Sequence, residues 1–219
     1  MAGMAAKKRP ERYTWADYQT WRDGHRYELI GGAVTAMAPS PGYDHQAIVG
    51  ALYVALARHF QGKPCRPILA PMDVRLDDGN VVQPDLLVVC DPAQLRSTHV
   101  EGAPTLVVEV LSPATWRHDR KTKLGLYAHF GVREYWLVTP VPALVEVLRL
   151  ERGAYLIAGV HRPGETLASP VFPELALDVA ALFAGVPLRP EDRIFEVCET
   201  DPAAEWGGQR HPPSPPTEP

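Results

Sequence analysis

The chain has 219 residues, a formal net charge of −4 and a hydrophobic fraction of 46%, which together are typical of a water-soluble globular protein with one good core. Its apolar runs fall short of the roughly 18 residues that suggest a membrane span, and its N-terminus lacks the apolar stretch of a secretory signal. The three cysteines are far apart and form no CxxC pair. We therefore expect a cytoplasmic protein with reduced thiols and no membrane contact.

The first half of the chain is expected to contribute two helices, a hairpin and several strands. Thr14 is a plausible N-cap for a short helix, and two strand-like runs around Gly31 and Gly32 predict a hairpin. Residues 44–61 carry apolar side chains at four-residue steps and predict an amphipathic helix. Strands are then expected at residues 66–70, 73–76 and 81–89. Pro84 is expected at a bulge or an edge of the last of these strands.

The second half predicts a strand, a helix and further strands. A polar loop at residues 91–102 precedes a very apolar strand at 105–111, and Pro113 and Gly131 mark the two ends of the next helix. The elements after it are a strand at 134–138, a hairpin of 143–150 and 154–160, a strand at 166–171 and a helix at 179–183. The expected organisation is one mixed α/β domain at 13–198, between a flexible basic N-terminus at 1–12 and a disordered Pro-rich tail at 199–219.

Two carboxylates interrupt apolar runs that look like buried strands. Asp85 follows Pro84 and precedes four apolar residues, and Glu109 lies in mid-strand between Val108 and Val110. An ionised carboxylate without a partner costs several kcal/mol in such a place, so a positive partner is expected. Asp85 can be a local cap of backbone amides and Glu109 half of a buried ion pair with an arginine. The alternative is one divalent cation held by both, since Mg²⁺ takes one or two protein carboxylates and keeps waters and phosphate oxygens as its other ligands.

A basic segment at residues 116–123 follows the Glu109 strand, with four Lys/Arg and one His. It can be a solvated face in which Asp119 and Lys123 form a surface ion pair. It can instead line a phosphate-binding site, with one lysine reaching the scissile phosphate. Glu28, in the first hairpin, is a weaker acidic candidate. The candidate substrate-binding residues in the second reading are Arg117, Arg120, Lys121 and His45, although a histidine at a helix terminus is more often structural.

The order of these residues resembles a known pattern. Pro84-Asp85 followed by Glu109 resembles the Pro-Asp…(Asp/Glu)-x-Lys signature of restriction-endonuclease-like nucleases. The chain is most similar to a family of restriction endonucleases that was long catalogued as a domain of unknown function and is abundant in cyanobacteria and actinobacteria. The resemblance covers roughly residues 14–185 and is carried by segments at 27–32, 45, 73–76, 82–86, 102–113, 119–127 and 131–136.

The resemblance implies an α/β fold with a restriction-endonuclease-like mixed sheet flanked by helices, an αβββαβ core, and here extra C-terminal strands. It implies that Mg²⁺ or Mn²⁺ is bound by Asp85, Glu109 and the backbone carbonyl of Val110. Glu28 would be an additional acid near the metal. The implied catalytic residues are Glu28, Asp85, Glu109 and Lys123.

The chain departs from the signature at its third position, where Leu111 stands in place of lysine. The family resemblance places the lysine on the following helix and points to Lys123, with Lys121 as the rival. An ammonium that reaches the site from a neighbouring helix can occupy the same space, so the departure is compatible with catalysis.

The expected function is a Mg²⁺-dependent endonuclease that hydrolyses phosphodiester bonds in DNA with a metal-activated water. Lys123 would orient that water or neutralise charge on the phosphate. The resemblance also makes a homodimer the expected assembly. One alternative is a catalytically weak or inactive module of the same fold that binds nucleic acid or a protein partner, because Leu111 breaks the signature and the net charge is slightly acidic. The other is a metal-dependent hydrolase of a different phosphate ester.

Overall fold

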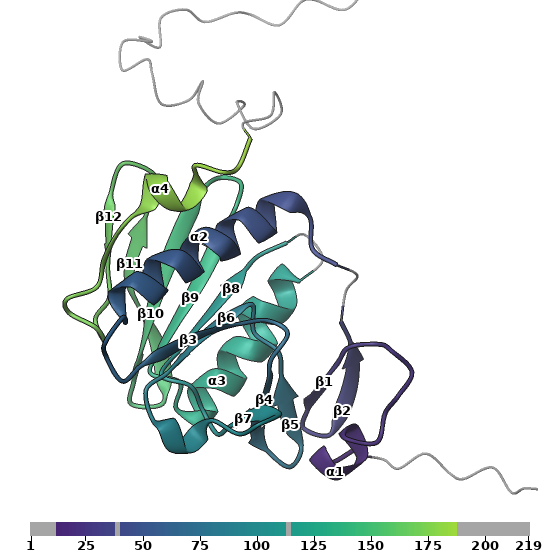
Figure 1. The fold of residues 1–219 in the computed structure, drawn as a ribbon. Coiled ribbons are helices and arrows are strands. Elements are labelled where there is room, and N and C mark those ends of the chain that lie inside the picture. Colours follow the sequence, from purple (N-terminus) through teal and green to yellow (C-terminus); the bar gives the residue numbers. More distant parts are fainter. Residues whose placement is uncertain (1–11, 38–39, 113–114, 188–219) are drawn as a thin grey trace, which may run out of the picture. The chain divides into compact units, whose positions relative to one another are not determined.

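The computed structural model describes residues 12–37, 40–112 and 115–187, and these form one compact unit (Figure 1). The expectations for the basic N-terminus, the Pro-rich tail and Pro113 fall mainly or wholly outside the described residues. The helical elements are α1 (Trp15–Tyr18), α2 (Tyr43–His59), a 3₁₀ turn η1 (Pro92–Gln94), a π turn η2 (His118–Lys123), α3 (Leu124–Phe130) and α4 (Val179–Phe183). None of these described helices is long and apolar enough to cross a membrane.

A six-stranded mixed sheet forms the centre of the unit, in the order β11-β10-β9-β8-β6-β3. Its strands are β3 (Arg66–Leu69), β6 (Leu86–Val89), β8 (Leu106–Val110), β9 (Glu134–Thr139), β10 (Leu144–Glu151) and β11 (Ala154–His161). Strands β8 and β9 are parallel, whereas the other neighbours are antiparallel. The chain crosses from β8 to β9 through η2 and α3, because two parallel strands need a long connection between them.

A five-stranded sheet has the order β2-β1-β5-β4-β7. Its strands are β1 (Tyr27–Ile30), β2 (Ala33–Ala36), β4 (Asp73–Asp77), β5 (Asn80–Val82) and β7 (His99–Glu101). Strands β1 and β2 form the hairpin expected around Gly31 and Gly32, whose φ angles of 58° and 77° lie in the left-handed region that glycine adopts at little cost. A two-stranded sheet of β12 (Thr166–Ala168) and β13 (Ala176–Asp178) completes the architecture.

Alternation along the strands gives the central sheet two buried faces. One face packs against α2 and α4 and contains Leu106 and Val108 of β8. The opposite face contains Val107 of β8 and packs against Tyr127 of α3. Because side chains two apart in a strand point the same way, Glu109 lies on the face of Val107, toward α3. The fold thus directs a carboxylate into an interior layer.

The expectation of a single strand at 81–89 is wrong. The chain leaves the five-stranded sheet after Val82 and enters the six-stranded sheet at Leu86. Pro84 has no N–H to donate to a ladder, so the strand is interrupted there. Asp85 therefore lies just before β6, in the short segment that connects the two sheets. Among the smaller differences, the first helix, expected to end near Gly24, ends at Tyr18, and the expected polar loop at 91–102 contains η1 and β7.

The expectation that the thiols are all reduced is wrong for two of the three cysteines. Cys65 and Cys90 form a disulfide with a Cα–Cα distance of 3.9 Å. Arg66 pairs with Val89 across the antiparallel strands β3 and β6, so the two cysteines are the next pair opposite each other. Their separation of 25 residues in sequence gave no sign of this pairing. Cys198 lies outside the described residues.

The core packing predicts the cost of removing a side chain at the centre of the sheet. Leu86 is 0% exposed and belongs to the core beneath α2, whereas the Leu156 residue of the edge strand β11 is 54% exposed. Leu86→Ala should lower the free energy of unfolding by about 3 kcal/mol, because it leaves a cavity. Leu156→Ala, the matched control, should change it by less than about 0.5 kcal/mol. Urea denaturation followed by circular dichroism measures both, and equal effects would contradict the packing described here.

Candidate active site

A cleft of about 670 Å³ opens beside the end of β8. Its wall includes residues of β1, α2, the start of β6, β8 and the π turn η2. The four expected catalytic residues all line it, and they come from four separate segments of the chain: Glu28, Asp85, Glu109 and Lys123. The structure therefore brings together in space the carboxylates and the lysine that the sequence singled out.

Asp85 and Glu109 face each other across the antiparallel strands β6 and β8. Leu86 pairs with Val108, which makes these two acids the next opposing positions. The Asp85 backbone N–H lies 3.4 Å from Oε2 of Glu109, and the Val110 N–H donates to Oδ2 of Asp85 at 2.8 Å. The two backbone amides fix the orientation of both carboxylates at the mouth of the cleft.

Lys123 is the centre of a buried ion cluster. Its Nζ lies 2.9 Å from Oε1 of Glu109 and 2.9 Å from Oε1 of Glu28, and 3.6 Å from Oδ1 of Asp119. Lys123 is only 4% exposed, so the reading of a solvated surface pair with Asp119 is wrong. Lys121, the rival lysine, is exposed and does not line the cleft.

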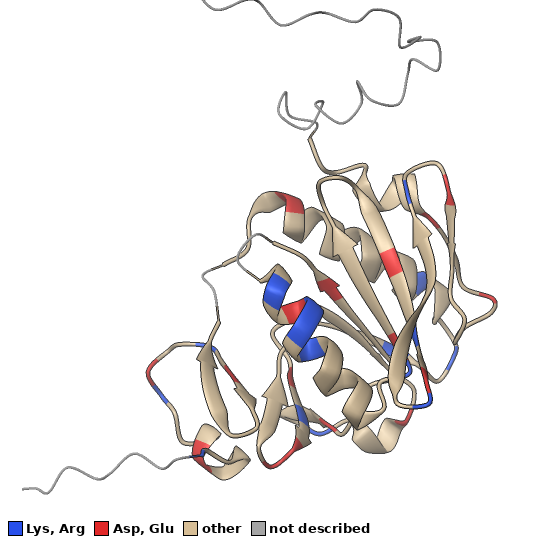
Figure 2. Ribbon diagram, turned by 180° about the vertical axis from the view of Figure 1, so that it is seen from behind, with Lys and Arg blue, Asp and Glu red and all other residues tan. Residues whose placement is uncertain are grey.

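The helical spacing explains why Lys123 points inward. Asp119, Lys123 and Tyr127 are four residues apart and lie on the buried side of η2 and α3. The wider π turn, in which the Leu124 N–H reaches the carbonyl of Asp119, falls at this position, and such π segments occur frequently at functional sites. In Figure 2 the turn before α3 shows one red segment among blue ones, because this stretch contains one acid, Asp119, and several basic residues.

Three neighbouring groups complete the hydrogen bonds of the buried acids. The Tyr127 hydroxyl donates to Oε1 of Glu109 at 3.1 Å. The Gln83 N–H donates to Oε1 of Glu28 at 3.0 Å, and Nε2 of His118 lies 3.2 Å from Oε2 of Glu28. Gln83 and Tyr127 lie in segments 82–86 and 119–127, which carry the family resemblance, and His118 lies in the basic segment. None of the three was predicted to be a site residue.

The cluster shifts the pKa values of its members in different directions. Burial alone would raise the pKa of Glu28, but the Lys123 ammonium and the hydrogen bonds from His118 and Gln83 outweigh it and lower that pKa to about 2. Burial, with the nearby carboxylates of Asp119 and Asp85, raises the pKa of Glu109 well above its ordinary value despite Lys123. Burial would lower the pKa of Lys123, but Glu109 and Glu28 raise it, so the ammonium stays charged.

The candidate substrate-binding residues are placed in different surroundings. His45 lines the cleft, and its Nε2 lies 3.0 Å from Oδ2 of Asp85. Arg120 pairs with Glu146 of β10, and Arg117 is exposed with its guanidinium 5.5 Å from the Trp116 ring. Neither arginine lines the cleft, and neither does Lys121.

The residues at the cleft fit a divalent cation by their chemistry. The described part of the chain holds no cluster of three or more His, Cys, Asp or Glu that frames a metal ion. It does hold two facing carboxylates, Asp85 and Glu109, and no described residue donates a hydrogen bond to Oδ1 of Asp85. Mg²⁺ needs only one or two protein carboxylates. Four acids line the cleft against Lys123 and Arg26, so acidic groups are in excess there and a cation would offset them.

The family model of Uma2, described as "Putative restriction endonuclease", matches residues 15–180. The chain belongs to the Uma2 family. The family expected from the sequence is thereby confirmed, and the match includes all the residues at the cleft.

One relative and one solved structure are similar to this chain. The uncharacterized protein slr1290 of Synechocystis sp. is 33% identical to this Uma2 chain over 144 residues, which are 64% of this chain and 73% of the relative. A crystal structure described as "a putative nuclease belonging to DUF820", from Anabaena variabilis, superposes with a TM-score of 0.63 at 19% identity. The match covers 78% of this chain and 98% of the Anabaena variabilis chain. This match confirms the expected fold class.

The buried ion cluster predicts unequal effects of removing two nearby lysines. Lys123→Met leaves three buried carboxylates without their cation and should lower the free energy of unfolding by roughly 3–5 kcal/mol. Lys121→Met removes an exposed ammonium two positions away and should change it by less than about 0.5 kcal/mol. Denaturant unfolding of both variants at pH 7 measures the difference. Equal stability of the two variants would rule out the cluster.

The lowered pKa of Glu28 predicts a pH-dependent contribution to stability. Its folded-state value of about 2 lies below the ordinary 4.5, so the ionised carboxylate stabilises the fold above pH 4.5. That contribution, on the order of 3 kcal/mol, should be lost as the pH falls from 4.5 toward 2. Urea unfolding of wild type and Glu28→Gln between pH 7 and 3 measures it, and the difference between them should shrink with acid. Glu174→Gln, at a side chain that is 83% exposed, is the control.

Proposed function

We propose that this Uma2 protein is a divalent-metal-dependent endonuclease that hydrolyses phosphodiester bonds in DNA. The observation that carries the proposal is the arrangement at the cleft. Two facing carboxylates, Asp85 and Glu109, lie beside a buried ammonium that is held 2.9 Å from Glu109. Carboxylates that suit a hard cation, together with a cation that suits a phosphate, are the groups that phosphodiester hydrolysis needs.

Asp85, Glu109 and the Val110 carbonyl would hold Mg²⁺ or Mn²⁺. When bound, the ion would lower the pKa of a water and stabilise charge on the phosphate. His45 and the Val110 N–H both contact Oδ2 of Asp85, which keeps that carboxylate oriented toward the cleft. Tyr127 does the same for Glu109 through its hydroxyl.

Lys123 supplies the positive charge at the reacting phosphate. Glu28 and Glu109 hold its ammonium at the wall of the cleft, and an ammonium has three protons to donate. Lys123 can therefore orient the attacking water or donate to a non-bridging phosphate oxygen as its charge grows. Glu28 acts through Lys123 as a positioning residue. Attack by water in line with the leaving oxygen needs no covalent enzyme intermediate.

The departure at Leu111 is compatible with this assignment. Leu111 is buried at 7% exposure and packs in the core on the α3 side of the sheet. The ammonium instead comes from η2 and reaches Glu109 from the neighbouring helix. DNA is the proposed partner, and the homodimer implied by the resemblance is part of the same proposal.

Cleavage of plasmid and linear duplex DNA tests the proposal. The purified protein should nick or cut DNA with Mg²⁺ or Mn²⁺ and lose this activity in EDTA. Asp85→Asn and Glu109→Gln should each lower the cleavage rate by at least about 100-fold, because each removes a carboxylate from the proposed metal site. Gel electrophoresis over time measures the rates.

Two controls separate the proposal from its alternatives. Lys121→Ala, at an exposed residue outside the cleft, should cleave at the wild-type rate. Cleavage that persists in both acid variants would show that the site is assigned wrongly. DNA binding without cleavage and without Asp85-dependent heat of Mn²⁺ binding in calorimetry would instead support a non-catalytic module. Faster turnover of a mononucleotide ester than of duplex DNA would support a different phosphate ester.

A further inference from the structure

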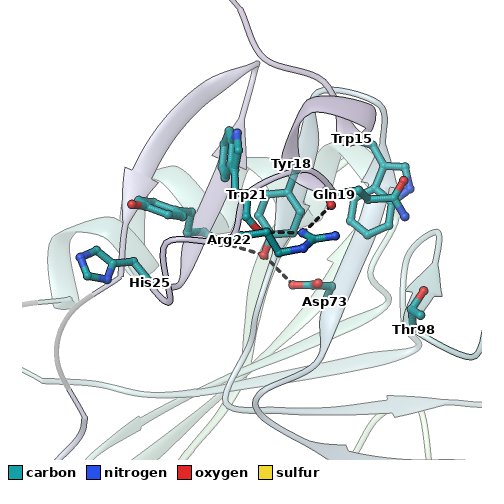
Figure 3. Close-up of a pocket in the computed structure, with 9 residues that line it drawn as sticks. Trp15, Tyr18, Gln19, Trp21, Arg22, His25, Asp73 and Thr98 are labelled. Carbon is teal, nitrogen blue, oxygen red and sulfur yellow. Dashed lines mark hydrogen bonds between the residues drawn. The ribbon is translucent and has the colours of Figure 1, made fainter.

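A second pocket, of about 360 Å³, lies on the other side of strand β1 from the cleft (Figure 3). Alternation along the chain before and within β1 separates the two cavities. Arg26 and Glu28 line the cleft, whereas His25 and Tyr27 line the second pocket. The role proposed for the cleft leaves this pocket unused.

Aromatic rings form one wall of the pocket. The ring centroids of Trp15 and Tyr18 are 5.5 Å apart and stacked at 18°, and Trp21 lies 5.3 Å from Tyr18. Tyr27 continues the row, 5.2 Å from Trp21. No residue of α1 is buried and Trp21 is also partly exposed. The rings therefore line the pocket and are partly open to it, although Trp15 stacks on Tyr18 and lies 4.8 Å from His99.

Asp73 places a hydrogen-bond acceptor among the rings. Its Oδ1 accepts from the Tyr18 hydroxyl at 2.8 Å and from Nε2 of Gln83 at 2.7 Å. No described residue donates to its Oδ2. Burial, with the adjacent Asp73 carboxylate, raises the pKa of Tyr18, so that hydroxyl stays a donor. The remaining oxygen of Asp73 can accept from a ligand.

Arg22 adds a fixed positive charge to the same pocket. Its NH1 group donates to the backbone carbonyls of Gln19 and Trp21, both at 2.7 Å, which holds the guanidinium over the pocket although the residue is exposed. Figure 3 shows Asp73 joined to the Tyr18 hydroxyl by a dashed line, and Arg22 among the residues that line the pocket. The pocket thus combines open rings, one free acceptor and one anchored cation.

We propose that this pocket binds one unpaired nucleotide whose base carries an exocyclic amino group. The base would stack on the aromatic wall, its amino group would donate to Oδ2 of Asp73, and its phosphate would contact Arg22. A base inside a duplex is stacked between its neighbours, so the pocket suits a base at a strand end or in a single strand. In the orientation that places the amino group of cytosine on Oδ2, a uracil or thymine base would place its O4 carbonyl there. It would have to shift to donate its N3–H instead, so it should bind more weakly.

Gln83 connects the pocket to the cleft. Its side-chain amide contacts Asp73 through Nε2 and Arg26 through Oε1, and its backbone N–H donates to Glu28. Gln83 would therefore be the residue that separates a nucleotide in the pocket from the acids at the cleft. The inference rests on the proposed nuclease function for the source of the nucleotide, which is the DNA strand being cut.

Binding of mononucleotides to the full chain, without metal and in EDTA, tests the inference through quenching of tryptophan fluorescence, to which Trp15 and Trp21 of the pocket contribute. The matched probes are dCMP and dUMP, which are similar in size and differ in an amino or a carbonyl group on the ring. We expect saturable quenching by dCMP and a dissociation constant for dUMP at least about tenfold weaker. Asp73→Asn should reverse this preference, because its amide would face the pocket with its N–H₂ group.

Arg22→Ala supplies a second, exposed variant whose folding is not in question. This variant should bind dCMP only as tightly as it binds deoxycytidine. Wild type should bind dCMP more tightly than the nucleoside. Glu174→Gln removes one distant exposed acid and should leave both affinities unchanged. Unfolding curves for each variant establish that it is folded.

The outcomes for the pocket and for the cleft are independent. Glu109→Gln should lose cleavage but bind dCMP like wild type, so failure of the nuclease proposal leaves the binding result readable. The inference is overturned if no mononucleotide quenches saturably, or if wild type binds dCMP and dUMP equally. Tight binding of a cationic peptide in place of nucleotides would also overturn it.

Discussion

The buried ammonium of Lys123 is the interaction on which the site depends. It lies between Glu28 of the five-stranded sheet and Glu109 of the six-stranded sheet, so one side chain joins the two sheets at the cleft. Three acids near it are almost fully buried, and an uncompensated buried carboxylate is costly. The lysine therefore offsets the charge of these buried acids, and in the proposed function the same ammonium would act on the phosphate.

Part of this arrangement was predictable from local sequence patterns, whereas the choice of Lys123 over Lys121 came from the family resemblance. Period-two alternation made Glu109 a buried carboxylate, and burial of a charge required a cation nearby. Asp119, Lys123 and Tyr127 follow one another at four-residue steps and therefore share one side of the helix. The spacing alone did not show whether that side faces the core or the solvent. The hairpin at Gly31 and Gly32 was predictable because few residues other than glycine adopt left-handed backbone angles easily.

What escaped prediction depends on contacts between distant segments. The change of sheet at Pro84 looks like a bulge in the sequence, since a missing N–H interrupts any ladder without saying where the chain goes next. The Cys65–Cys90 disulfide follows from strand register, which a separation of 25 residues does not reveal. The basic helix suggested several phosphate contacts, but a helix has only one inner face, and Arg120 faces Glu146 instead.

Asp85 is more exposed than the other acids at the cleft, which affects how freely it can be substituted during evolution. Its side chain is 24% exposed, and it pairs with His45, whereas Glu28 and Glu109 are sealed around Lys123. Selection for a stable fold alone would retain the sealed residues, because losing any of them unbalances the interior. A lineage that abandoned cleavage would thus be free to vary first at Asp85. If the proposed nuclease function holds, the residue before β6 is the position at which a loss of cleavage would disturb the buried cluster least.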